Sequence, residues 1–127
     1  MAKVDNAVNK TEEVDAFMAD LDHPFKPGVE LIRAHIKAGN KGITEQVKWN
    51  APSFSYKGVY LTTFNLFSRP KVFLVFHHPH VVTIDDERLE GKYPDRRLLF
   101  FDDLADAKKK KPFVRSVVTE LIKTINK

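Results

Sequence analysis

The stretch 48-KWNAPSFSYKG-58 divides the chain into two parts with different hydrophobic patterns. Before it, apolar residues recur at the spacing of amphipathic helices, and after it the spacing shifts towards the two-residue period of β-strands. Asn50, Ala51 and Pro52 are expected to form a turn, because proline biases the residue before it away from helical angles. The stretch also holds Trp49, the only tryptophan of the chain. It is therefore the predicted corner between helices and sheet.

Two helices are predicted before this corner. The first is expected to be capped by Asn9 or Thr11, and its apolar stripe consists of Val14, Phe17, Met18 and Leu21. Two prolines in four residues stop it, and Pro27 suits the first turn of a second helix. That helix is predicted to end in a left-handed cap at Gly39-Asn40. Residues 43–48 are expected to add a short helical turn.

Strands and a final helix are predicted after the corner. Lys57-Gly58 allows a tight turn, and VFLVF at 72–76 and RRLLFF at 96–101 are typical of strands. The Asp102-Asp103 pair supplies a cap for the last helix, within which Pro112 is expected to begin a new helix or to cause a kink. This order predicts an α+β fold, a two-layer sandwich of an antiparallel sheet of about four or five strands packed against N-terminal and C-terminal helices.

The composition indicates one domain over residues 1–127, with residues 1–10 as a candidate disordered segment. The chain has no cysteine, which excludes disulfides, thiolate nucleophiles and cysteine-ligated zinc. The first residues lack the apolar core of a signal peptide and no stretch has the length of a bilayer span, so a cytoplasmic protein without membrane contact is expected. The net charge of +4 combines an acidic segment, residues 1–22, with a basic remainder.

Motifs of catalysis are absent from the sequence, which lacks a P-loop, a dinucleotide-binding glycine motif, a zinc-protease motif and a serine nucleophile elbow. A protein that is not an enzyme is therefore predicted. Polar and aromatic residues of the corner and of the following strands instead have the composition of a small-ligand pocket. The candidate ligand-binding residues are Trp49, Asn50, Phe54, Tyr56, Asn65 and His77. A packed structural corner, with the indole beneath the sheet, is the alternative.

Two sets of charged residues suggest other partners, namely cations and nucleic acid. The acids of the first helix point in several directions, which gives a dispersed anionic surface that attracts hard cations weakly. The run Lys108, Lys109, Lys110 and Lys111 is the nucleic-acid candidate, with Tyr56, Tyr60 and Phe64 as aromatics that a sheet-based RNA reader would use. No RNP-like motif accompanies them, so a solvated helix surface is favoured and nucleic acid is the less favoured partner.

The stretch ITEQVKWNAPSFSYKGVYLTTFNL, residues 43–66, resembles the signature of the YdhG-like domain family, a domain of unknown function. That signature is a helix end, K-W-N-x-P-x-F, an aromatic–glycine turn and T-F-N. The likeness extends to VDAFMADLDHP, VFLVFH and FDDLADAKKK, and so to most of the chain. It implies a small cytoplasmic domain with a sheet packed on helices. The run HHPH at 77–80 departs from the family pattern, in which a shorter strand end is followed by glycine.

One branch of that family is described as an intracellular iron chaperone with a frataxin-like role. The resemblance therefore implies iron as the cargo and an iron–sulfur or haem assembly protein as the partner. By fold-level analogy with frataxins, the candidate metal ligands are Glu12, Glu13, Asp15 and Asp20.

Three hypotheses follow. The first is a non-enzymatic binding domain, for iron or for a small molecule, as a monomer or a homodimer. The second is an interaction domain for nucleic acid or protein that uses the basic C-terminal region. The third is an enzyme with a small-ligand pocket at the corner between Trp49 and Tyr56.

Overall fold

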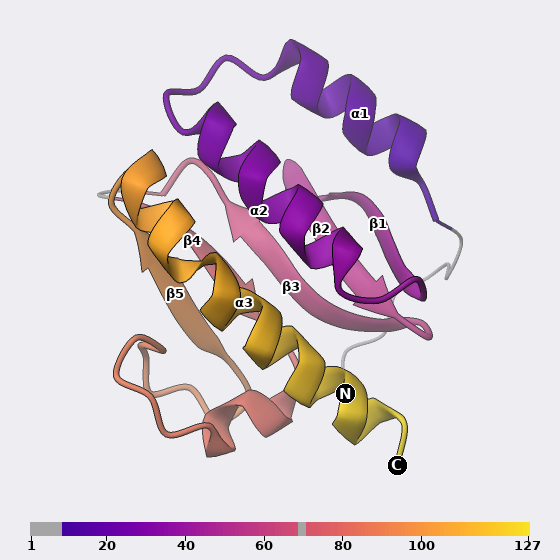
Figure 1. Cartoon of the computed structure of the whole chain (residues 1–127), viewed down its shortest axis with the longest axis vertical. Coiled ribbons are helices and arrows are strands. Elements are labelled where there is room, and N and C mark those ends of the chain that lie inside the picture. The colour runs from indigo at the N-terminus through magenta and orange to yellow at the C-terminus, as the bar shows by residue number, and fades with distance from the viewer. Residues whose placement is uncertain (1–8, 69–70) are drawn as a thin grey trace.

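The computed structural model describes residues 9–68 and 71–127; part of the predicted disordered segment, residues 1–8, lies outside them. Three helices lie on one face of a five-stranded sheet (Figure 1). All neighbouring strands are antiparallel, in the order β1-β2-β3-β4-β5. The predicted α+β two-layer fold is confirmed. The elements are α1 (Thr11–Asp20), α2 (Lys26–Ala38), β1 (Ile43–Lys48), β2 (Ala51–Tyr56), β3 (Val59–Asn65), β4 (Val72–Phe76), the 3-10 helix η1 (Pro79–Thr83), β5 (Arg97–Phe101) and α3 (Leu104–Ile125).

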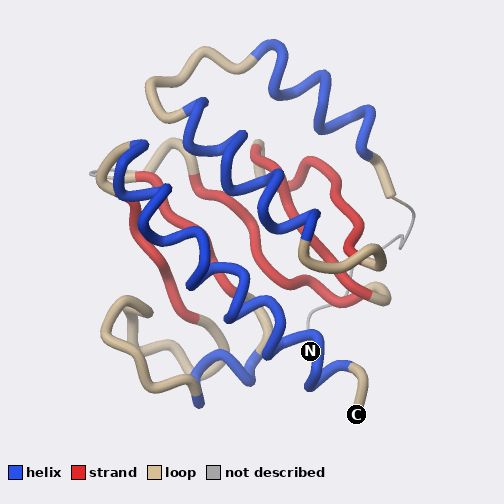
Figure 2. The backbone as a smooth tube through the Cα atoms, in the orientation of Figure 1, coloured by secondary structure: helices blue, strands red, loops and turns tan. Residues whose placement is uncertain are grey.

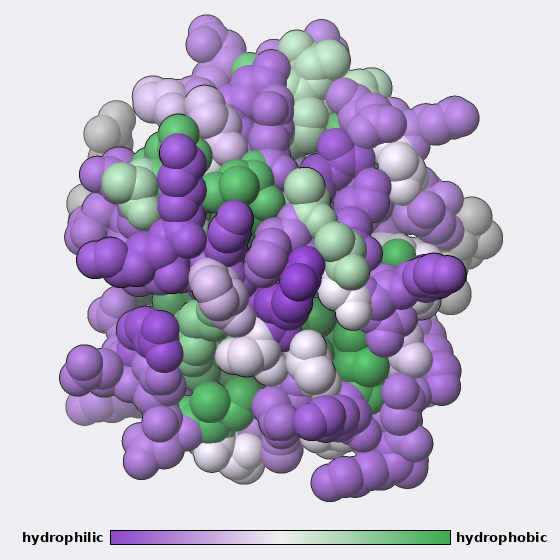
Figure 3. Space-filling view, in the orientation of Figure 1, coloured by the Kyte–Doolittle hydropathy of each residue, from purple (hydrophilic) through white to green (hydrophobic). Residues whose placement is uncertain are grey.

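The core lies between the helices and the sheet (Figure 2). Alternation along the strands sends one set of side chains, including Phe64 and Leu74, towards the helices, where both are buried. Apolar stripes of α2 and α3 cover them, through residues such as Ile32 and Leu121. Figure 3 views this side of the molecule, where hydrophilic residues predominate and hydrophobic ones show mainly between them. The helices therefore close one face of the sheet and leave the other available for a site.

A buried ion-pair network fixes α1 and α2 to the edge strand β1. Glu45 is only 2% exposed, and its carboxylate accepts hydrogen bonds from Arg33 Nε at 2.8 Å and Thr11 Oγ1 at 2.8 Å. Lys37 Nζ lies 2.6 Å from the same carboxylate. Burial opposes ionisation of Glu45, but the hydrogen bonds from Arg33, Lys37 and Thr11 outweigh it and hold its pKa below the ordinary value. The network therefore stabilises the charged carboxylate.

Tight turns connect β1 to β2 and β2 to β3. Trp49 and Asn50 have φ values of 52° and 58°, and Lys57 and Gly58 have 50° and 76°. Positive φ at both central residues is the feature of a two-residue type I′ hairpin. The tight turn predicted at Lys57-Gly58 is confirmed. The predicted turn at Asn50, Ala51 and Pro52 is wrong by about one residue, because Ala51 already pairs with Lys48.

Four further local predictions need correction. Residues 43–48 form strand β1 and not a helical turn, since their backbone pairs with β2. Gly39 ends α2 with φ −77°, so it is not a left-handed cap. Lys10 is the cap residue of α1 and makes no capping hydrogen bond with its side chain, while the Asn9 and Thr11 side chains form hydrogen bonds with Glu45. Helix α3 continues through Pro112, with buried residues on either side of it, so no new helix begins there; the alternative of a kink stays a prediction. The predicted cap at Asp103 is confirmed by its 2.8 Å bond from Asp106 N.

Candidate functional site

A hollow of about 640 Å³ lies on the sheet face opposite the helices. Its residues come from the β1–β2 turn, β3, the β3–β4 turn, β4 and the segment before β5. Thr63 and Val75 are directly paired neighbours in β3 and β4, and each stands one residue from a side chain that packs under the helices. They therefore project to the other face and form part of the floor of the hollow.

Three aromatic rings from separate segments form one wall. The ring centroids of Trp49 and Tyr60 are 5.5 Å apart, those of Trp49 and His77 are 5.6 Å apart, and those of Tyr60 and His77 are 5.7 Å apart. The interplanar angles of 39° to 54° show that the rings are tilted and not stacked flat on one another. Trp49 is 66% exposed, so most of its indole surface remains open to a ligand.

Trp49 occupies a left-handed backbone position that the hairpin requires but that does not require a tryptophan. Bulky residues with positive φ are uncommon, and the two-residue hairpin prefers Asn, Asp or Gly at this position. Such strain clusters at ligand sites, where it sets the direction of a side chain. The strained turn places the indole against Tyr60 and His77.

A chain of hydroxyl and imidazole groups crosses the floor. Thr63 Oγ1 lies 2.7 Å from Ser53 Oγ and 2.9 Å from His77 Nε2. Burial, together with the nearby Arg96, lowers the pKa of His77 to about 4. The imidazole is therefore uncharged at neutral pH and offers one N–H and one acceptor nitrogen. His77 therefore lines the hollow and forms a hydrogen bond within it.

The rim carries an ion pair and an amide. Arg96 Nε lies 3.0 Å from Asp95 Oδ1, and Arg96 Nη2 lies 3.5 Å from Asp95 Oδ2. Asn65 Oδ1 accepts a 3.0 Å hydrogen bond from Ser68 N, which fixes the β3–β4 turn beside the hollow. The rim therefore offers hydrogen-bond donors and acceptors, and the opposite charges of Asp95 and Arg96 cancel each other.

The structure brings together three of the six predicted ligand-binding residues: Trp49, Asn65 and His77. The placement of the other three in this hollow is wrong. Phe54 is fully buried against Phe64 in the core, and Tyr56 is buried with its hydroxyl accepting a 3.2 Å bond from Asn126 Nδ2. Both follow from alternation along β2, which turns their side chains towards the helices. The alternative with the indole packed beneath the sheet is also wrong, because Trp49 is exposed.

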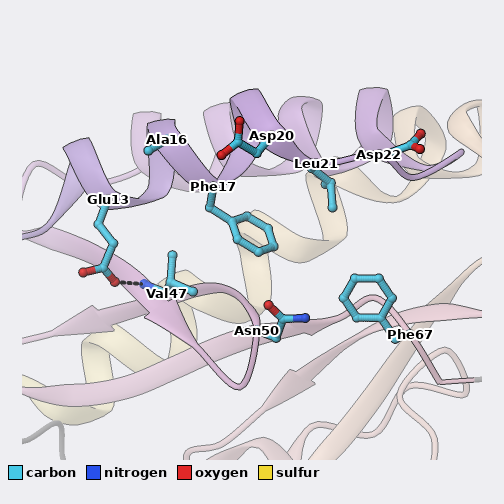
Figure 4. A pocket seen from close by; sticks show the side chains of 9 residues that line it. All are labelled: Glu13, Ala16, Phe17, Asp20, Leu21, Asp22, Val47, Asn50 and Phe67. Atoms are coloured by element: carbon cyan, nitrogen blue, oxygen red, sulfur yellow. Dashed lines mark hydrogen bonds between the residues drawn. The ribbon is translucent and has the colours of Figure 1, made fainter.

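Asn50 lies in a different cavity, a cleft of about 560 Å³ between α1 and the β1–β2 turn. Figure 4 shows Phe17 reaching from α1 towards Asn50, with Phe67 beside it. Phe67 borders both this cleft and the hollow. The two central residues of one hairpin turn, Trp49 and Asn50, therefore serve different cavities.

Several residues of the hollow were not among the predicted ligand-binding residues, including Tyr60, Thr63, Asp95 and Arg96. Thr63 stands two residues before Asn65, so the strand period places both on one face, and this signal was available in the sequence. The face on which Tyr60 lies depends on the register shift between β2 and β3, which the sequence pattern does not show. Asp95 and Arg96 follow a long excursion whose path no local pattern gives.

The acids predicted as metal ligands are not gathered at one point. Among residues 9–68 and 71–127, no group of three or more His, Cys, Asp or Glu side chains is placed to hold a metal ion. Glu13 accepts a 2.9 Å hydrogen bond from Val47 N at the sheet edge (Figure 4), and Asp15 pairs with Arg33 at 2.7 Å. Glu12 and Asp20 are exposed on α1. The iron-binding role stays a prediction of the family resemblance.

The lysine run lies in α3, on the side of the sheet opposite the hollow (Figure 1). Four consecutive helical residues point around most of the helix, so Lys108–Lys111 do not form one basic face. Lys110 is committed to Asp106 at 2.8 Å and to the carbonyl oxygen of Phe100 at 2.7 Å. Of the aromatics proposed for RNA, Tyr56 and Phe64 belong to the hydrophobic core, whereas Tyr60 forms part of the wall of the hollow.

Comparison of the chain with models of protein families, with curated proteins and with solved structures finds no match. The likeness to the YdhG-like family therefore stays a prediction from the quoted motifs. Within the described residues, no helix combines the length and the apolar character that a bilayer span requires.

Proposed function

We propose that the protein is a binding domain for a small organic molecule, held in the hollow beside Trp49. The observation that carries this proposal is the convergence of Trp49, Tyr60 and His77, from three separate segments, on one hollow of about 640 Å³. Aromatic walls with a few polar groups, in a space of this size, are typical of small-ligand sites. The strained backbone at Trp49 supports the proposal, since Asn or Gly would occupy this hairpin position with less strain.

Binding is favoured over catalysis by the state of His77. Its Nε2 contacts Thr63 Oγ1 at 2.9 Å, a geometry that would suit a base beside a hydroxyl nucleophile. Burial lowers the pKa of His77 to about 4, however, so the imidazole is a weak base at neutral pH. An efficient general base has a pKa nearer the working pH. We therefore assign the Thr63–His77 pair to ligand recognition.

The test is a screen of small aromatic and aliphatic molecules by two-dimensional NMR on uniformly ¹⁵N-labelled protein. The chain has one tryptophan, so the indole N–H gives a single resolved signal from the wall of the hollow. Ligands are expected to shift this signal saturably, together with backbone signals of Thr63 and His77.

Two variants make the screen specific. Trp49→Asn removes the indole and is expected to weaken binding by about tenfold or more, since one stacking contact contributes roughly 1–3 kcal/mol. Leu104→Gln, at an exposed apolar residue at the start of α3, is the control and is expected to bind like the wild type. Ligands whose shifts cluster at Asn50 and Phe17, in the α1 cleft, would contradict the proposed site.

A further inference from the structure

The polar groups of the hollow define the ligand more narrowly than its aromatic wall does. Asn65 uses Oδ1 to hold the β3–β4 turn, which leaves its Nδ2 as the donor for a ligand. Arg96 uses Nε and Nη2 on Asp95, which leaves Nη1 as a second donor. Asp95 retains carboxylate lone pairs as acceptors. Donors and acceptors therefore lie close together around the hollow.

The charges of the hollow favour a ligand without net charge. Asp95 and Arg96 form an ion pair at the rim and cancel each other. The imidazole of His77 is neutral at pH 7 because burial disfavours its protonated form. A carboxylate ligand would meet Asp95 as well as Arg96, and an ammonium ligand would meet Arg96 as well as Asp95. Neither sign of charge gains from entering this site.

The aromatic wall favours a flat ring. Trp49 leaves 66% of its surface exposed, and it is tilted by 49° to Tyr60 and by 39° to His77. These angles leave the indole face unstacked by its neighbours. A planar π-system can cover that face, while its edge reaches the polar groups of Asn65 and Arg96.

We propose that the hollow binds an uncharged planar heterocycle whose edge carries a ring carbonyl beside a ring N–H, which is the chemistry of a nucleobase. The inference rests on the proposed function. The carbonyl accepts from the Asn65 or Arg96 donors, the ring N–H donates to Asp95, and the ring lies against Trp49. We assign a free base or nucleoside rather than a base within RNA, because the charged residues described at the rim, Asp95 and Arg96, cancel each other and Lys108–Lys111 lie on the other side of the sheet.

The experiment compares matched probes in NMR titrations of the wild-type protein. Uridine and inosine carry the carbonyl and N–H edge; 3-methyluridine and 1-methylinosine lack the N–H; orotate adds a negative charge. Uridine or inosine is expected to shift the Trp49 indole signal saturably. The methylated and the anionic probes are expected to bind about tenfold more weakly, the loss of roughly one hydrogen bond to a charged group. Arg96→Gln, at a half-exposed position, is expected to weaken the binding of uridine and inosine without unfolding the protein.

The outcomes of these titrations separate the inference about the ligand from the proposed binding function. Equal affinity for the methylated and unmethylated nucleosides would overturn the inference about the edge. Binding of indole or p-cresol in the hollow without binding of the nucleosides would overturn the inference and leave the proposed function standing. No shift of the indole signal by any probe or screened molecule would overturn both. Tighter, salt-sensitive binding of a uridine oligonucleotide than of uridine would overturn the assignment to a free small molecule.

Discussion

Replacing Trp49 by asparagine is expected to change the free energy of unfolding by less than about 1 kcal/mol, although it removes the only tryptophan. Trp49 is 66% exposed, so about a third of a side chain of roughly 250 Å² is buried. At about 25 cal/mol per Å² that burial contributes roughly 2 kcal/mol, an upper bound. Asparagine relieves a left-handed backbone strain of roughly 1–2 kcal/mol. The two terms nearly cancel.

The assay is urea unfolding followed by circular dichroism at 222 nm, which does not depend on the indole. Phe54→Ala is the matched comparison, because Phe54 lies five residues further along the chain and is fully buried. That variant is expected to lose about 3–5 kcal/mol, the cost of removing a core aromatic ring. A loss above about 2 kcal/mol for Trp49→Asn would refute the reasoning, since it would show that the indole is a structural residue.

Three further outcomes are expected. Glu45→Gln should lower the free energy of unfolding by about 3 kcal/mol at pH 7, against less than about 0.5 kcal/mol for the exposed Glu30→Gln. Because the pKa of Glu45 is lowered in the folded state, the difference in stability from wild type should narrow as the pH falls below about 4.5. A difference that stays constant with pH would contradict the ion-pair network. The His77 ring signals should not titrate between pH 5 and 8. As the pH falls, the unfolded chain should take up the proton before the folded protein does, so stability should rise from about pH 4 to about pH 6.5; an NMR midpoint near 6.5 would contradict the lowered pKa of His77. Lys110→Met should lower the free energy of unfolding by about 1 kcal/mol and Lys108→Met should leave it almost unchanged, because it is Lys110 that bonds the Phe100 carbonyl oxygen and Asp106. Equal changes of the melting temperature in the two variants would contradict this role of Lys110.

The architecture could be predicted because most of it depends on local patterns. The stripe around Ile32 has the period of an amphipathic helix. The run 72–76 is short, wholly apolar and rich in β-branched and aromatic residues, which is typical of a buried strand, and Lys57-Gly58 is a favourable hairpin turn. The failure at residues 43–48 has a physical cause. That segment alternates Ile43, Glu45 and Val47 on one face, and the apolar alternation is broken by Glu45, whose burial depends on cations from α2.

The candidate site was only partly predictable, for a related reason. His77 and Asn65 were found because they follow or end apolar strands, where side chains often meet at a site. Phe54 failed because face alternation outweighs closeness in sequence: it is five residues from Trp49 but on the other face of the sheet. Arg96 depends on the return path of a long loop, and the direction of Trp49 depends on a strained turn that no propensity favours.

The most direct measurement is a crystal structure of the protein grown with saturating uridine or inosine. The proposed site predicts difference density for a flat ring against the Trp49 indole, with its edge within hydrogen-bond distance of Asn65 or Arg96. Density confined to the cleft between α1 and Asn50, or an empty hollow at a concentration that saturates the NMR shifts, would contradict the site.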